Sequence, residues 1–159
     1  MKKIMMPAVL AIFTIVTFTE CKKSDNKSTP VVTSMTATIN GLPFSGSLSV
    51  YALNGSSIEI DGGNQNTQNN LTLQLLDPYI RLYIDNYMLG TLGDFTFGSG
   101  TSAASGSIDS NSAMATYVVG HTGTITITVS TPSVVKGTFN FVSLDGTAVT
   151  NGAFTAKPN

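Results

Sequence analysis

The stretch GTITITV, residues 123–129, carries the clearest structural signal in the chain. Isoleucine or valine stands at every second position and threonine between them, so an extended strand here has one apolar and one polar side. Branched side chains of this kind also pack well on a pleated surface. The stretch therefore predicts a β-strand with one buried face.

Shorter stretches with the same alternation lie on both sides of this strand. They occupy residues 35–39, 48–52, 58–60, 71–75, 139–141 and 149–155. In residues 48–52 the apolar positions are Leu48, Val50 and Ala52. Turn signals such as Asn54-Gly55, Asp61-Gly62-Gly63 and Asp145-Gly146 follow or separate them. Short strands broken by such turns indicate an all-β domain, either an antiparallel sandwich or a barrel. Of the two we predict a single antiparallel β-sandwich of about eight or nine strands.

Residues 77–90 have two interpretations. As a helix, the segment would begin with Asp77 as its cap and Pro78 in the first turn. As a strand, it would turn three apolar side chains inward: Ile80, Leu82 and Ile84. Its outward side would then carry Tyr79, Arg81, Tyr83, Asp85 and Tyr87. The aromatic and β-branched composition favours the strand.

The amino-terminal residues resemble a bacterial lipoprotein signal. Two lysines precede an apolar stretch at residues 4–18, and the only cysteine, Cys21, follows it. Fifteen apolar residues are short of the roughly 20 that a membrane-spanning helix needs. We therefore predict a lipoprotein signal peptide over residues 1–20 and lipidation of Cys21. Glu20 departs from the small residue expected there, and a cleaved secretory signal or an uncleaved anchor is the alternative.

A polar segment separates this cysteine from the strands. Residues 22–33 are rich in lysine, serine and threonine and contain Pro30, a composition typical of flexible linkers. We therefore expect the lipidated cysteine and a tether over residues 21–33, and the β-sandwich domain over residues 34–159. The anchor predicts a cell-envelope location, lipid-attached and most consistent with the outer membrane, on either its periplasmic or its surface face. With one cysteine, no intrachain disulfide can form.

Four segments resemble a family of small uncharacterised lipoproteins from Bacteroidetes-type bacteria. They are Thr36-Ala37-Thr38-Ile39-Asn40-Gly41 with Phe44, Gly123-Thr124-Ile125-Thr126-Ile127, Lys136-Gly137-Thr138-Phe139-Asn140-Phe141 and Thr150-Asn151-Gly152-Ala153-Phe154-Thr155. The resemblance implies one all-β domain on a lipid tether. Its motifs are structural, and it supplies no catalytic residue.

The sequence offers little for catalysis or metal binding. The only histidine, His121, lies in a turn-like stretch without a nucleophile motif, and one histidine with a lipidated cysteine supplies too few ligands for a zinc site. A glycoside hydrolase needs two placed carboxylates, and only Glu59 and Asp85 fall on outward strand positions. Calcium ligands could come from residues 109–112 or from Asp61 with Asn64, Asn66 and Asn69, but both sets are typical of solvated loops. We predict no catalytic residue, no metal and no cofactor.

Charge and aromatic residues indicate what kind of partner to expect. From residue 30 onward three basic side chains face seven acidic ones, so no basic patch for nucleic acid exists. Tyr79, Arg81, Tyr83 and Tyr87 on one exposed strand face are candidates for binding a ligand, because flat rings stack on sugars or anchor proteins. The sequence therefore predicts a non-enzymatic binding or accessory module for glycan or an envelope protein. The alternatives are a subunit of an adhesive surface assembly built by strand-edge pairing and a glycan-active hydrolase.

Overall fold

The computed structural model describes residues 30–65, 75–98, 103–109 and 117–159, and these residues form ten β-strands and no helix. The strands are β1 (Ser34–Ile39), β2 (Leu42–Gly46), β3 (Leu48–Asn54), β4 (Ser57–Gln65), β5 (Leu75–Ile84), β6 (Gly93–Thr96), β7 (Ala104–Asp109), β8 (Tyr117–Thr131), β9 (Val134–Ser143) and β10 (Ala148–Pro158). The predicted signal peptide over residues 1–20, Cys21 and most of the tether lie outside the described residues. The all-β prediction is confirmed.

Seven of these strands close into a barrel-like sheet. Around the ring the order is β3, β4, β5, β7, β8, β9 and β10. Closure depends on the end of β10, which pairs in parallel with β3 through Lys157↔Val50 and Pro158↔Tyr51. All other strand pairs are antiparallel. The structure is therefore a barrel rather than the predicted antiparallel β-sandwich of eight or nine strands, because β10 and β8 each continue from one layer into the other.

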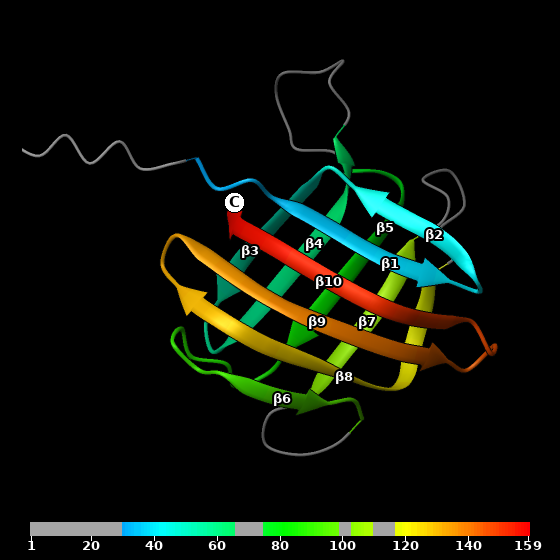
Figure 1. Cartoon of the computed structure of the whole chain (residues 1–159). Helices are drawn as coiled ribbons and strands as arrows, with labels where there is room; N and C mark the ends of the chain where they lie inside the picture. The colour runs from blue at the N-terminus through cyan, green and yellow to red at the C-terminus, as the bar shows by residue number, and fades with distance from the viewer. Residues whose placement is uncertain (1–29, 66–74, 99–102, 110–116) are drawn as a thin grey trace, which may run out of the picture.

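The barrel is flattened into two crossing layers (Figure 1). The front layer contains β2, β1, β10, β9, β8 and β6, and the strands β3, β4, β5 and β7 run across behind it. The β1–β2 hairpin extends the front layer beside β10, and β6 pairs with β8 on the opposite side. Near-perpendicular layers of this kind are joined at corners where strands pass from one layer to the other.

The core lies between the two layers and follows from the alternation in the sequence. β9 alternates buried and exposed residues along its length, and the two central isoleucines of β8, Ile125 and Ile127, are almost completely buried. Phe139 and Phe141 of β9 stack at a ring separation of 6.4 Å. The apolar side of each strand thus meets the apolar side of the crossing layer, as the sequence predicted for these strands.

Two strands differ from the sequence interpretation. On β3, Tyr51 faces the core opposite Ile60, while Leu48 and Val50 are buried but do not belong to the main core cluster. The Tyr51 hydroxyl donates to the backbone oxygen of Pro132 at 2.9 Å, which explains how a tyrosine is accommodated inside. β4 does not turn at Asp61-Gly62-Gly63 but continues to Gln65. The glycines lie inside the strand because β1 crosses closely over Gly62.

The segment 77–90 is a strand at first, as the composition favoured. β5 buries Ile80, Leu82 and Ile84 completely, so the predicted inward set is confirmed. The chain then turns at Asn86, whose φ is +51°, and the two-residue alternation ends there. Tyr87 consequently lies in the core, 2 % exposed, and its predicted place on the outward face is wrong.

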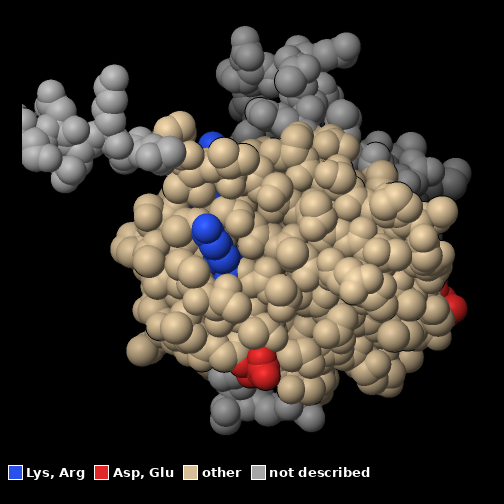
Figure 2. Space-filling view, in the orientation of Figure 1, with Lys and Arg blue, Asp and Glu red and all other residues tan. Residues whose placement is uncertain are grey.

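The exposed side of the front layer is almost uncharged. Figure 2 shows few blue or red atoms on it, and among Lys, Arg, Asp and Glu its strands carry only Asp94, Lys136 and Lys157. Threonines such as Thr124, Thr126 and Thr138 fill much of the rest. None of the described residues forms a helix with the length and apolar character that crossing a bilayer requires.

Candidate functional site

β5 presents two tyrosines and an arginine on the outer side of the back layer. Tyr79, Arg81 and Tyr83 are successive outward residues, and all three are partly exposed. The tyrosines are four positions apart along the strand, which places their Cα atoms about 13 Å from each other. The Arg81 guanidinium carbon lies 5.8 Å from the centroid of the Tyr79 ring, within range of a cation–π contact.

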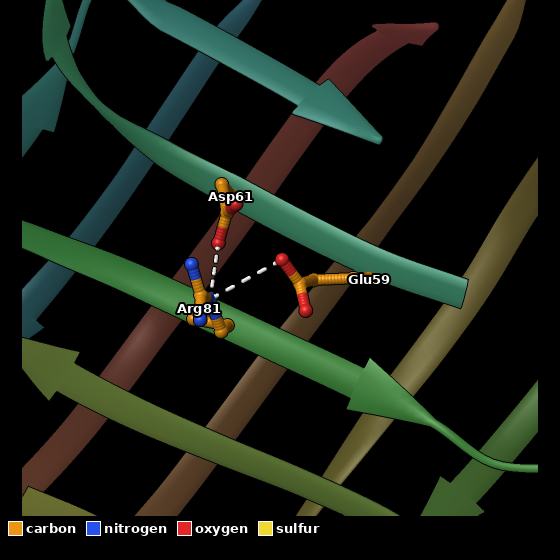
Figure 3. Close-up of polar contacts among 3 residues, drawn as sticks. All are labelled: Glu59, Asp61 and Arg81. Carbon is orange, nitrogen blue, oxygen red and sulfur yellow. Dashed lines mark hydrogen bonds and ion pairs between the residues drawn. The ribbon is translucent and has the colours of Figure 1, made fainter. Parts of the chain in front are cut away.

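Two carboxylates of β4 hold this arginine (Figure 3). The Nε of Arg81 donates to Oδ1 of Asp61 at 2.8 Å and lies 3.5 Å from Oε1 of Glu59. The strand register causes this contact, because Asp61 lies directly opposite Arg81 and Glu59 lies opposite Tyr83. We call these five residues the Tyr–Arg face: Glu59, Asp61, Tyr79, Arg81 and Tyr83.

The surroundings shift the ionisation of several of these groups. Burial, and then the neighbouring Asp61 carboxylate, raise the pKa of Glu59, although Arg81 acts in the opposite direction. The hydrogen bond to Asp61 raises the pKa of Arg81, so this side chain is always charged. Burial raises the pKa of Tyr79, and Arg81 partly offsets the effect. The face therefore combines one guanidinium group, two carboxyl groups and two phenol groups.

The Tyr–Arg face combines flat apolar surface with hydrogen-bonding groups. The side chains of Arg81 and Glu59 are 38 % and 35 % exposed, whereas Asp61 is 19 % exposed. An ion pair at this exposure contributes at most about 1 kcal/mol to stability, so it holds Arg81 in place more than it stabilises the fold. Partly exposed rings beside fixed charged groups can stack on a ligand and hydrogen-bond to its edge.

The structure brings together three of the four predicted binding residues. Tyr79, Arg81 and Tyr83 share the face, but the Tyr87 hydroxyl lies 2.6 Å from the Ser130 hydroxyl and its ring lies 5.7 Å from that of Phe95. Asp61 was not predicted as a member of this face, because the two glycines after it indicated a turn. Its position two residues after Glu59 places both acids on one side of a strand, and this spacing was the available signal.

The other candidate residues do not form a site. His121 is exposed and lies in β8 beside a bulge rather than in a turn. Asp85 lies just beyond β5 and is exposed. Asp145 is a turn residue as predicted, and its carboxylate accepts a hydrogen bond from the backbone of Thr147 at 2.9 Å. Hydrogen bonds, above all from the Ser143 hydroxyl, lower its pKa.

The proposed calcium ligands are only partly described. Asp61 is paired with Arg81, and the side-chain oxygen of Asn64 accepts from the backbone of Ser47 at 3.3 Å. Asn66, Asn69 and residues 110–112 lie outside the described residues. In the part of the chain that the structure describes, no three His, Cys, Asp or Glu side chains gather closely enough to hold a metal ion.

A cavity of about 330 Å³ opens elsewhere, beneath the β1–β2 hairpin. Its lining is apolar: Ile39, Leu42, Pro43, Phe44, Pro78 and Ile108. A pocket without polar side chains offers no group that would orient a sugar. This cavity therefore does not compete with the Tyr–Arg face as a glycan site.

The geometry gives no support to the hydrolase alternative. Glycoside hydrolysis places the scissile bond between two carboxyl groups. Here the guanidinium of Arg81 contacts both Glu59 and Asp61, as Figure 3 shows, and so lies where that bond would have to be. The absence of catalysis nevertheless stays a prediction.

The two outer strands of the front layer bear on the assembly alternative. β2 contains Pro43, which has no N–H to donate to an added strand, and β6 has four residues, one of them Asp94. Short, charged or proline-containing edges are devices that oppose strand addition. These two edges therefore do not favour an assembly built by edge pairing.

Comparisons of the chain with family models, with curated proteins and with solved structures found no match. The resemblance to Bacteroidetes-type lipoproteins therefore stays a prediction.

Proposed function

We propose that this protein is a non-enzymatic, lipid-anchored binding module of the cell envelope and that the Tyr–Arg face binds glycan. The observation that carries the proposal is the pair of partly exposed tyrosines on one side of β5 with a fixed, hydrogen-bonding arginine between them. Tyrosine rings supply stacking surface at little cost in conformational entropy. The ion pairs to Asp61 and Glu59 hold Arg81 in place before a ligand arrives, which lowers the ordering cost of binding.

The amino-terminal sequence supports the proposed location. A lipid on Cys21 and a tether to residue 33 would keep the domain within about 45 Å of the membrane surface, since each residue spans at most about 3.6 Å. A binding module held there meets its ligand at high local concentration, so modest affinity is sufficient.

Glycan-array screening of the full chain, followed by calorimetry on the best ligand, tests the proposal. Tyr83→Ala removes one stacking surface and should weaken binding about tenfold or more. The matched control is Thr138→Ala, an exposed β9 residue on the opposite layer, which should bind as the wild type does. Glycan binding that Tyr83→Ala leaves unchanged would exclude this face, and selective capture of an envelope protein instead would favour the protein-binding alternative.

A further inference from the structure

The two layers of the barrel differ in charge. The strands β3, β4, β5 and β7 contain one basic and four acidic residues, whereas the six front strands contain two basic and one acidic. The back layer is thus net negative by three formal charges, and the front layer is net positive by one. A ligand that approaches the Tyr–Arg face meets a field that favours cations and disfavours anions.

Within this face Glu59 is the carboxyl group that Arg81 engages less closely. The 2.8 Å hydrogen bond makes Asp61 the direct partner of Arg81, while the 3.5 Å separation from Glu59 is too long for a good hydrogen bond. The Arg81 charge is therefore balanced mainly by the more buried Asp61. Glu59, with a third of its side chain exposed, keeps acceptor capacity for a ligand.

Tyr83 lies directly across from Glu59 in the strand register, so its ring and the carboxylate project from the same side of the sheet. A carboxylate beside an aromatic ring attracts an organic cation in two ways, by ion pairing and by the ring quadrupole. A sugar that carries an ammonium group can make both of these contacts while its ring stacks on Tyr83. A uronic acid in the same place would face an unfavourable carboxylate, and the charge of Arg81 is already balanced mainly by Asp61.

Resting on the proposed function, we infer that the glycan recognised by the Tyr–Arg face bears free amino groups. The ligand ammonium lies at Glu59 beside the Tyr83 ring, and neighbouring sugar units extend along β5 toward Tyr79. An uncharged sugar keeps the stacking but loses the ion pair. A polyanionic glycan is excluded by charge.

Calorimetry with three oligosaccharides of equal length tests this inference: glucosamine, N-acetylglucosamine and galacturonate hexamers. With the full chain at low salt and pH 7, the glucosamine hexamer should bind about fivefold to tenfold more tightly than its acetylated form. The galacturonate hexamer should bind weakest. Added salt should reduce the preference, because the contact is partly exposed.

The variant Glu59→Gln keeps the size of the side chain and should remove the preference for the glucosamine hexamer. Its matched control, Asp94→Asn, removes one acidic charge from β6 on the other layer and should leave the preference intact. A preference that persists in Glu59→Gln overturns the inference. The inference is also overturned if the acetylated hexamer, the galacturonate hexamer or another glycan without amino groups binds as tightly as the glucosamine hexamer or more tightly. In all these cases the proposed function still stands. If no hexamer and no arrayed glycan binds, the proposed function fails together with the inference.

Discussion

Replacing Gly62 with alanine probes how β4 passes through the barrel. A methyl group at Gly62 would lie 2.4 Å from both Cβ and Sδ of Met35 and 2.7 Å from its Cε. Ordinary carbon contacts are about 3.5–4.0 Å. Met35 is completely buried, and its Cβ is fixed to the backbone of β1, so a new rotamer cannot relieve the clash. β1 must move away from β4, and we expect a loss of about 3 kcal/mol, the upper end of the usual overpacking cost.

Urea unfolding followed by circular dichroism measures this loss. With a slope of about 1.5 kcal/mol per molar urea, the midpoint should fall by about 2 M. Gly55→Ala is the matched control: φ at Gly55 is +64° and no atom lies within 4 Å of the added methyl, so only backbone strain of about 1 kcal/mol is expected. If the urea midpoint of Gly62→Ala equals or exceeds that of this control, residues 61–63 form an exposed turn. The described course of β4 through residues 61–63 would then be refuted.

Three other outcomes follow from the same contacts. Tyr87→Phe loses the hydrogen bond to Ser130 and should lower the free energy of unfolding by about 1 kcal/mol in the same urea assay. Tyr83→Phe should change this free energy little. A larger loss in Tyr83→Phe than in Tyr87→Phe would place Tyr87 outside the core. The folded state raises the pKa of Glu59, so its contribution to stability is greatest below the ordinary glutamate pKa of 4.5 and is lost as pH rises through the folded pKa. Glu59→Gln should therefore gain stability relative to the wild type as pH rises above 4.5, as pH-dependent melting curves would show. A wild type that gains instead would reverse the sign of this shift. Metabolic labelling with palmitate should disappear in Cys21→Ala, and label that remains would remove the lipoprotein proposal.

The sequence was sufficient to predict those parts of the fold that local alternation controls. The buried isoleucines of β8, the phenylalanines of β9 and the inward residues of β5 all lie where a two-residue period puts them. Glu59 was also predicted to point outward, and it does. These positions are predictable because each strand has one face on the core, so the period alone fixes the side.

Features that depend on distant contacts were not predictable in this way. Gly62 is inside a strand because Met35 packs on it, 27 positions earlier in the chain. Tyr87 is buried because a left-handed residue at Asn86 ends the alternation before it. Barrel closure depends on two residues at the end of β10 that pair with β3. For the site, the same limitation hid Asp61, whose role is visible only once β4 and β5 are placed in register.

Mapping of a bound glycan by backbone amide NMR tests the central claim most directly. With the ¹⁵N-labelled full chain and a saturating amount of the tightest oligosaccharide from the array, we expect the largest amide shifts in β4, β5 and β7, centred on Arg81 and Tyr83. Shifts concentrated instead in β1, β9 and β10, with β5 unchanged, would contradict the assignment of glycan binding to the Tyr–Arg face.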